Sequence, residues 1–309
     1  MSSETYIGIE IGGSKLQVVA GEGTGKILRR WRADADRDRG RPGICEQLVQ
    51  GIAQVRAGLS PRALGVGFGG PIDSQTGHIA RSHQVHGWED FALRSWLEEL
   101  THLPAVAEND SNTAALAEAT RGAGAGANPV FYFNLGSGVG GGAVIGGKIY
   151  HGLPPGEAEF GHLRLDRTGA TVESRCSGWA IDRRIRELVD THSTGILARS
   201  IGPKIGGESR HLAVARAEND PLALRIVEEL SDDLAFALSH VVHLFHPAVI
   251  VLGGGLSLLG EPLRNGIAQR LPAYVMEVFA PGPPIRIAAL GEDAVPVGAL
   301  ILAGQIKQD

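Results

Sequence analysis

The chain has too few cysteines for a disulfide scaffold and no segment apolar enough for a membrane span. Cys45 and Cys176 are the only cysteines among 309 residues, so neither a disulfide framework nor a cysteine-rich metal site is expected. No apolar run approaches the length that crosses a bilayer, and no basic and then apolar leader stands at the N-terminus. These absences predict a cytoplasmic protein without a membrane partner.

Positive charge is scarce as well. Lys and Arg total 29 against 34 Asp and Glu, which gives a net charge of −5, and the sequence contains no polybasic run. That balance argues against nucleic acid as a partner and favours a small neutral or phosphorylated ligand. Hydrophobic residues make up 43% and charged residues 20% of the chain, as in ordinary folded proteins, which excludes wholesale disorder and a coiled coil.

Glycine is the residue in excess, because 44 glycines are about twice the usual proportion. Many follow short, β-rich apolar runs, in clusters at residues 12–13, 65–70, 136–147 and 253–255. Since glycine lacks a Cβ, a turn of this kind lets main-chain N–H groups approach phosphate oxygens. One glycine loop alone is more often a simple tight turn, but several at strand ends favour a nucleotide ligand.

Two of the clusters share one layout. A strand over residues 6–10 enters Gly12-Gly13-Ser14 and returns as a strand over residues 16–20. At Gly136, 124 positions after Gly12, a strand over residues 130–135 enters a second glycine turn and also returns. The repeated hairpin predicts a duplicated architecture with two halves that face each other.

Strands and helices alternate along the rest of the chain. Further strands are predicted over residues 63–68, 105–108, 249–252 and 285–289. Apolar side chains repeat with helical spacing over residues 93–100 and 222–245, and the second run ends before Pro247. Two more helices are predicted, one beginning at residues 109–111 and one at Pro296. This alternation is typical of an α/β protein.

Two polar clusters have more than one interpretation from the residues alone. Asn109 or Asp110 could cap the helix that begins there, or Asp110 could act as a catalytic carboxylate. The acidic and histidine side chains of residues 157–162 lie on a stretch flanked by Gly156 and Gly161 and are either surface charges or ligand contacts. A zinc site is disfavoured, because structural zinc needs four ligands and only His162 and Cys176 are near.

Taken together, these features resemble the ROK family of bacterial sugar kinases over essentially the whole chain. The strongest motifs lie in residues 108–115 (ENDSNTAA), 135–142 (LGSGVGGG) and 157–162 (EAEFGH), in the family's order and spacing. The resemblance implies a two-lobed, actin-like ATPase fold of the duplicated ribonuclease H-like type, with a cleft between the lobes. An N-terminal lobe is expected over residues 1–120, joined by a C-terminal helix at 295–309, and a C-terminal lobe over 121–294.

The resemblance also implies roles for individual residues. Asp110 resembles the family's catalytic base, which accepts the proton of the attacking sugar hydroxyl. The residues expected to bind the sugar are Gly70, Asn109, Asp110, Glu159, His162 and Glu173. The residues expected to hold the phosphates of ATP are Gly12, Gly13, Ser14, Lys15, Gly136, Ser137 and Gly138, with adenosine against Gly253, Gly254 and Gly255.

Three positions depart from the family pattern. Glu10 stands where an aspartate associated with Mg²⁺ is usual, and Gln84 stands where a sugar-contacting asparagine is common. The family's C-x-C-G-x-x-G-C cluster after the histidine is absent, so we expect no structural zinc. His162 would then need another acceptor to fix its tautomer.

The resemblance implies an ATP- and Mg²⁺-dependent kinase that converts glucose to glucose 6-phosphate, and a homodimeric assembly. An N-acetylhexosamine or fructose kinase is the alternative within this class. A catalytically weak, sugar-binding member of the family is the alternative outside it. A repressor is disfavoured, because the first hairpin begins by Tyr6 and leaves no room for a DNA-binding segment before it.

Overall fold

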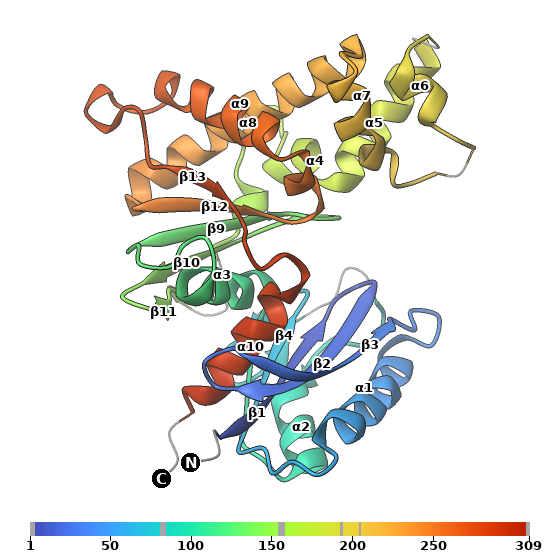
Figure 1. Cartoon of the computed structure of the whole chain (residues 1–309), viewed down its shortest axis with the longest axis vertical. Coiled ribbons are helices and arrows are strands. Elements are labelled where there is room, and N and C mark those ends of the chain that lie inside the picture. Colours follow the sequence, from blue (N-terminus) through green and yellow to red (C-terminus); the bar gives the residue numbers. More distant parts are fainter. Residues whose placement is uncertain (1–3, 81–84, 154–157, 192–193, 204, 307–309) are drawn as a thin grey trace. The chain divides into compact units, whose positions relative to one another are not determined.

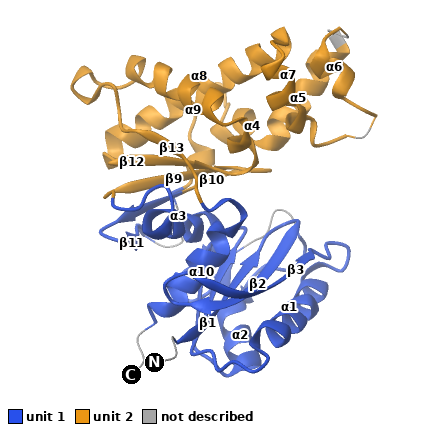
Figure 2. Ribbon diagram, viewed as in Figure 1, with its two compact units in different colours: residues 1–126, 142–158, 290–309 blue, residues 127–141, 159–289 orange. Residues whose placement is uncertain are grey.

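The computed structural model describes residues 4–80, 85–153, 158–191, 194–203 and 205–306 (Figure 1). Contacts divide the chain into two compact units (Figure 2). Unit 1 comprises Met1–Gly126, Gly142–Ala158 and Leu290–Asp309, and unit 2 comprises Ala127–Gly141 and Glu159–Ala289. Residues 142–158 group with unit 1 in this division, whereas the motifs assigned them to the C-terminal lobe. The lobe boundaries stay a prediction.

Unit 1 is built on a five-stranded mixed sheet. Its strands are β1 (Thr5–Ile11), β2 (Lys15–Glu22), β3 (Ile27–Asp34), β4 (Leu64–Phe68) and β8 (Ala105–Asn109), in the order β3-β2-β1-β4-β8. β1, β2 and β3 pair antiparallel, whereas β4 is parallel to both β1 and β8. All five residues of β4 are buried, as expected for a central parallel strand that is covered on both faces.

Helices cover this sheet. α1 (Gly40–Arg56) packs on β2 and β3, and α2 (Leu93–Thr101) packs on β8. α10 (Ala294–Gly304), which starts before the predicted Pro296, packs on β1, β4 and α3 (Asp110–Arg121). A small sheet is formed by β5 (Ile72–Asp73), β6 (His78–Ile79) and β7 (Phe91–Ala92). In the core, the buried rings of Phe68 and Trp88 meet edge to face with centroids 5.3 Å apart.

Several glycines of unit 1 let α10 approach its neighbours closely. A Cβ at Gly65 of β4 would lie 2.0 Å from the carbonyl oxygen of Ala299. A Cβ at Gly298 of the helix would lie 2.0 Å from the carbonyl oxygen of Thr113 in α3. The glycine cluster at 65–70, which the sequence associated with a ligand turn, therefore serves helix packing in part.

Unit 2 contains most of a second five-stranded sheet. Its strands are β9 (Val130–Leu135), β10 (Val139–Ile145), β11 (Lys148–Ile149), β12 (Val249–Gly253) and β13 (Ile285–Ile287), in the order β11-β10-β9-β12-β13. The chain passes from unit 2 to unit 1 within β10. Counted along the chain, both sheets have the strand order third, second, first, fourth, fifth. The duplicated architecture that the two hairpins predicted is thereby confirmed.

The longest helix of unit 2 is α8 (Pro221–Phe245), on which three other helices of this unit pack, α4 (Val172–Cys176), α7 (Leu212–Ala217) and α9 (Glu261–Arg270). Asp220 caps α8 by accepting hydrogen bonds from the N–H groups of Leu222 and Ala223, each at 3.0 Å. It ends at Phe245, before Pro247, as predicted. The other helices are α5 (Gly178–Thr191) and α6 (Ile196–Ser200).

Short 3-10 helices complete the described chain. They are η1 (Phe160–His162), η2 (Glu208–His211), η3 (Gly255–Leu259), η4 (Leu271–Ala273) and η5 (Glu277–Phe279), and η6 (Gly291–Asp293) in unit 1. None of the helices in the described ranges combines the length with the apolar character that crossing a membrane requires.

Candidate functional site

Three predicted site segments meet at one edge of the unit 1 sheet. The parallel strands β1, β4 and β8 end there in register, and ligands commonly bind at such carboxyl ends. The chain leaves these strands as residues 12–15, as Gly69-Gly70 and as Asp110. A Cβ at Gly69 would lie 3.3 Å from Asp110 Oδ2 and 3.6 Å from Gly12 Cα. The first glycine turn, the end of β4 and the Asp110 carboxylate are therefore neighbours.

The start of α3 shows which residue caps this helix. Asn109 Oδ1 accepts hydrogen bonds from the N–H groups of Ser111 and Asn112, at 2.9 and 3.2 Å. Asn109 Nδ2 donates to the carbonyl oxygen of Gly70, 3.3 Å away. Asp110 is the first helical residue and accepts a hydrogen bond from Ser111 Oγ at 3.3 Å. Of the two interpretations of this cluster, capping belongs to Asn109, and a catalytic role for Asp110 stays a prediction.

The first glycine turn presents main-chain N–H groups. The Gly12 N–H donates to the carbonyl oxygen of Lys15 at 3.0 Å and closes the turn. The N–H groups of Gly13 and Ser14 donate to no acceptor in the described part of the chain. Consecutive N–H groups of this kind form a concave site that suits an anion.

Glu10 lies in a polar network beside this turn. One of its carboxylate oxygens accepts a hydrogen bond from Gln17 Nε2 at 2.5 Å, and the other lies 3.6 Å from Lys15 Nζ. Burial raises the pKa of Glu10, Lys15 and Gln17 oppose that shift, and the negative charge of Asp110 adds to it. A Cβ at Gly12 would lie 4.0 Å from Glu10 Oε1, so this carboxylate borders the same turn that adjoins Gly69 and Asp110.

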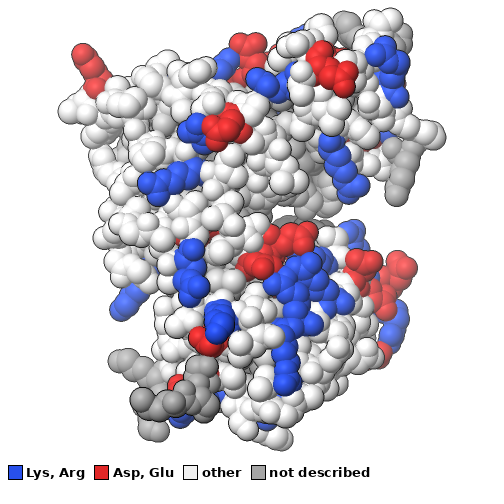
Figure 3. Space-filling model, in the orientation of Figure 1, with Lys and Arg blue, Asp and Glu red and all other residues white. Residues whose placement is uncertain are grey.

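Charged residues of β3 extend the network, and Figure 3 shows blue and red side chains gathered over β2, β3 and η6. Gln17 Oε1 accepts hydrogen bonds from Arg32 Nε at 2.6 Å and Arg30 Nη1 at 3.2 Å. Arg30 also pairs with Asp293 of η6 at 2.6 Å. Sequence reasoning missed Gln17, a fully buried polar residue, although its place opposite Glu10 in the hairpin was an available signal.

The second glycine turn, in unit 2, is fixed by the start of two helices. The N–H of Gly178 donates to the carbonyl oxygen of Gly136 at 2.7 Å. The N–H of Val139 donates to Glu173 Oε2 at 2.9 Å, and a Cβ at Gly138 would lie 2.6 Å from that same oxygen. Glu173, predicted to bind the sugar, therefore also holds the turn that is predicted to bind phosphate.

Glu159 and His162 stand at the two ends of the region around η1. Between them Phe160 is buried and packs on Phe131 and Phe133 of β9, with ring centroids 5.8 and 5.3 Å away. This anchor leaves the side chains of His162 and Glu159 exposed at 72% and 51%. His162 Nε2 lies 3.9 Å from Glu159 Oε2, which is longer than a hydrogen bond. The two side chains that are predicted to contact the sugar are therefore exposed beside each other on unit 2.

The third glycine segment is constrained largely by packing. A Cβ at Gly253 would lie 2.3 Å from the hydroxyl oxygen of Tyr132. Gly254 has φ +82°, and a Cβ there would lie 2.2 Å from Asn134 Oδ1. A Cβ at Gly255 would meet nothing within 4 Å. The fold itself requires the first two glycines, and the predicted role of the segment beside adenosine stays a prediction.

Sequence reasoning also missed the role of the residue before Asn109. Glu108 is 2% exposed, and its Oε1 accepts hydrogen bonds from the Asn109 N–H at 2.8 Å and from Asn112 Nδ2 at 3.1 Å. Its Oε2 lies 2.5 Å from Nε2 of His151, a residue 43 positions later in the chain. An acid next to the Asn-Asp pair was visible in the sequence, but neither its burial nor its contact with His151 was.

No cluster of three or more His, Cys, Asp or Glu side chains suited to a metal occurs within the described ranges. Burial raises the pKa of Cys45 to about 11 and also raises the pKa of Cys176. A raised pKa favours the protonated thiol, whereas a metal ligand is the deprotonated thiolate. Gln84 and Glu157 lie outside the described residues.

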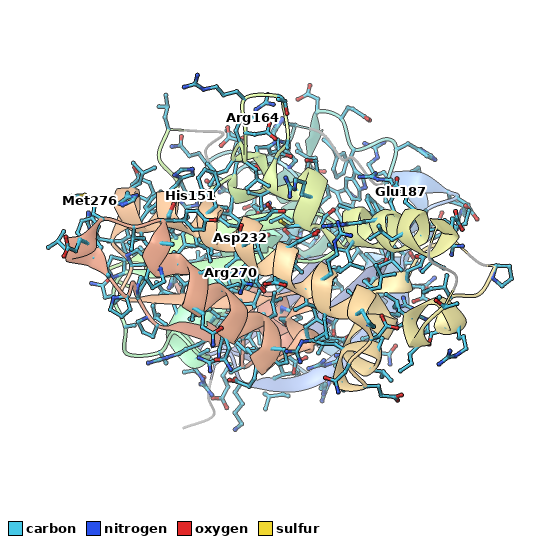
Figure 4. All side chains as sticks on the ribbon, turned by 90° about the horizontal axis from the view of Figure 1, so that it is seen from above. His151, Arg164, Glu187, Asp232, Arg270 and Met276 are labelled. Carbon is cyan, nitrogen blue, oxygen red and sulfur yellow. The ribbon has the colours of Figure 1, made fainter. Side chains whose placement is uncertain are left out.

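A charged hollow of about 320 Å³ lies on unit 2 between α4, α8 and α9. Figure 4 shows Arg270 of α9 beside Asp232 of α8, and Arg270 Nη2 lies 2.7 Å from Glu228 Oε1. Arg175 Nε lies 2.8 Å from Asp233 Oδ2. Because these carboxylates are paired with arginines, the hollow is a network of ion pairs that joins three helices.

The two sheets of identical strand order, each with a glycine-tipped hairpin, define an α/β protein of the actin-like ATPase fold. The ROK family pattern matches residues 6–306, and the chain belongs to the ROK family.

The chain is similar to several glucokinases over nearly its full length. It is 32% identical to a glucokinase of Halalkalibacterium halodurans, covering 96% of this chain and 94% of that protein. It is 29% identical to a glucokinase of Thermotoga maritima, covering 95% of each. A solved ROK family glucokinase from Streptomyces griseus, in complex with glucose and AMPPNP, has 29% identity and a TM-score of 0.85, covering 98% of this chain and 100% of that one.

Proposed function

We propose that the chain is an ATP-dependent sugar kinase, and that it converts glucose to glucose 6-phosphate. The observation that carries the proposal is the edge of the unit 1 sheet, where the Asp110 carboxylate adjoins Gly69 and the Gly12 turn. Phosphoryl transfer to an alcohol requires a proton acceptor close to main-chain N–H groups that can bind the phosphates. The glucokinases of H. halodurans and T. maritima, and the S. griseus complex with glucose and AMPPNP, support the proposal.

The proposed reaction is a single displacement. The sugar hydroxyl oxygen attacks the terminal phosphorus of ATP and forms a new phosphorus–oxygen bond. The bond from that phosphorus to the bridging oxygen breaks, and ADP leaves with the electron pair. Asp110 accepts the hydroxyl proton, which leaves the sugar as a phosphate ester. Asn109 uses one Nδ2 hydrogen on Gly70, so its second one can donate to a sugar oxygen.

We assign the phosphates of ATP to the two glycine turns. In unit 1 the N–H groups of Gly13 and Ser14 and the charge of Lys15 would bind them, and in unit 2 the turn of residues 136–138 would do so. Mg²⁺, when bound, neutralises charge on the phosphates. Glu10, beside the first glycine turn, would hold this ion indirectly through water molecules, since Mg²⁺ keeps several waters and takes only one or two protein carboxylates together with substrate phosphates.

We assign further contacts with the sugar, and the contacts with adenosine, to residues of unit 2. Glu159 and His162 are exposed neighbours that can exchange hydrogen bonds with sugar hydroxyls. Glu173 accepts one hydrogen bond from Val139 N–H at Oε2, and a carboxylate has further acceptor positions for a hydroxyl. Adenosine is assigned to the segment 253–255.

An assay of ADP release over a panel of sugars tests the proposal. We expect the highest kcat/KM with glucose, and we expect Asp110→Asn to lower kcat by roughly 10²- to 10⁴-fold, the usual contribution of a general base. Asp38→Asn, a change at an exposed aspartate, is the matched control and should leave kcat unchanged. An Asp110→Asn variant as active as the wild type would overturn the proposal. If N-acetylhexosamine or fructose were the best substrate, the proposed kinase activity would stand and only the identity of the sugar would change.

A sugar-binding protein with weak catalysis is the second candidate, and the state of Glu10 favours it. Both carboxylate oxygens of Glu10 face partners of the chain itself, Gln17 Nε2 at 2.5 Å and Lys15 Nζ at 3.6 Å, and these partners compete with a metal ion for the carboxylate. Calorimetry that detects glucose binding but no ATP binding would support this candidate. The cytoplasmic location and the homodimer stay predictions.

A further inference from the structure

We infer that His151 is a positioning residue that holds the start of α3, and with it Asp110, through the carboxylate of Glu108. The inference rests on the proposed function, because it assigns His151 to the reaction in which Asp110 is the proposed base. His151, Glu108 and Asp110 all belong to unit 1, and His151 comes two residues after β11, the second strand of the β10–β11 hairpin.

Glu108 is a buried carboxylate that depends on hydrogen-bond donors around it. Its side chain is 3% exposed, and a buried carboxylate is tolerated only where hydrogen-bond donors surround it. Two donors, the N–H of Asn109 and Nδ2 of Asn112, come from the same strand–helix junction. The ring of His151 is the donor that reaches Glu108 from elsewhere in the chain, at 2.5 Å, and its side chain is 33% exposed.

Hydrogen bonds connect Glu108 to the residues beside Asp110. The Asn109 N–H is held by Glu108 at 2.8 Å, Asn109 Oδ1 caps α3, and Asn109 Nδ2 binds the carbonyl oxygen of Gly70. Asp110 follows directly as the first helical residue. A turn of the Glu108 carboxylate therefore shifts the main chain from which Asp110 projects.

A further observation is the state of Asn112. Its Nδ2 donates to Glu108, while its Oδ1 is buried and has no hydrogen-bond partner among the described residues. An unsatisfied buried acceptor destabilises a fold, so its presence needs a reason. Holding Glu108 supplies one.

The hairpin that leads to His151 is also fitted to this helix. A Cβ at Gly142 of β10 would lie 2.7 Å from Cβ of Ala115 and 3.0 Å from Oδ1 of Asn112. Only glycine lets β10 pass so close to the first turns of α3. The hairpin that precedes His151 is therefore tightly packed against α3, the helix that follows Glu108 and Asn109.

The experiment compares the full-length wild type with His151→Ala, His151→Gln and Asp110→Asn, by kcat, by KM for glucose and ATP, and by thermal unfolding. We expect His151→Ala to lower kcat about 10- to 100-fold, because small misplacements of a reacting group have effects of this size. KM for ATP should stay within a factor of about two, since the glycine turns are untouched. His151→Gln keeps an N–H donor and should recover kcat to within about threefold of the wild type.

Two further variants separate positioning from a general structural effect. His78→Ala removes an exposed histidine–carboxylate pair of the same unit, His78 with Asp90 at 3.4 Å, and should leave kcat unchanged. In a Glu108→Gln background, His151→Ala should lower kcat no further, because the link to α3 is already lost.

The outcomes distinguish this inference from the proposed function. An active wild type, an inactive Asp110→Asn and a His151→Ala variant with unchanged kcat would overturn the inference alone. A His151→Gln variant as impaired as His151→Ala would also overturn it, and this arm decides the matter if the alanine variant fails to fold. A wild type that phosphorylates no sugar, or an active Asp110→Asn, would overturn the proposed function and the inference with it.

Discussion

Glu10 stands where the family usually carries aspartate, and its surroundings show how this chain accommodates the longer acid. Gln17 donates to one carboxylate oxygen at 2.5 Å, and Lys15 lies 3.6 Å from the other. Burial nevertheless outweighs both partners and raises the pKa of Glu10. Ionisation of Glu10 is therefore less favourable in the folded protein than in the unfolded chain.

A stability prediction follows at this residue scale. Because the pKa of Glu10 is raised above its ordinary value of 4.5, the folded protein binds this proton more tightly than the unfolded chain does. The contribution of Glu10 to the free energy of unfolding therefore falls as pH rises from 4.5 to the raised value, and is constant above it. Glu10→Gln should gain stability relative to the wild type over that window, as measured by urea unfolding at several pH values.

Glu46 is the matched control, because its pKa is shifted in the opposite direction to that of Glu10. The pKa of Glu46 is lowered by its pairing with Arg39, so the wild type loses this contribution as pH falls. Glu46→Gln should therefore approach wild-type stability at low pH. A Glu10→Gln variant that loses stability relative to the wild type as pH rises would contradict the account of Glu10.

At the scale of elements, glycines decide how closely α10 packs on the sheet. Gly65→Ala would place a Cβ 2.0 Å from the main-chain carbonyl oxygen of Ala299, which cannot rotate away. We expect a loss of about 1 to 3 kcal/mol in the free energy of unfolding, the usual range for an overpacked core, measured by urea denaturation. Gly202→Ala, where a Cβ would meet nothing within 4 Å, should change stability far less. Equal effects of the two changes would contradict this packing account.

The elements that the sequence predicted are those with strong periodicity or clear end signals. The strands before each glycine turn and the helices α2, α3 and α8 lie close to their predicted ranges, because apolar spacing, Asn109 and Pro247 mark them. Helix α1 was not predicted, because glycine inside a helix is unfavourable by propensity. Tertiary packing overrides propensity there, since a Cβ at Gly51 would lie 2.5 Å from the Trp31 ring.

The candidate site was predictable to a similar extent. The resemblance to the ROK family pointed to Gly12, Gly70 and Asp110, and in the structure these residues lie where the parallel strands β1, β4 and β8 end at one edge of a sheet. The partners Glu108 and His151 could not be paired, because their contact depends on how the β10–β11 hairpin packs on α3. No local pattern encodes such a contact.

At the scale of the whole molecule, the proposal requires that one chain binds two ligands. We expect glucose and an ATP analogue each to raise the melting temperature, because a ligand at about 100 times its Kd adds about 2.7 kcal/mol to the stability of the folded state. Differential scanning calorimetry with each ligand alone and with both measures this. A shift with glucose but none with the nucleotide would favour the catalytically weak, sugar-binding candidate.

Product analysis by phosphorus NMR tests the central claim most directly. Wild-type protein incubated with glucose, ATP and Mg²⁺ should form ADP and glucose 6-phosphate in equal amounts, and Asp110→Asn under the same conditions should form almost none. Release of inorganic phosphate without a sugar phosphate, or equal product from Asp110→Asn, would contradict a transfer to the sugar hydroxyl assisted by this carboxylate.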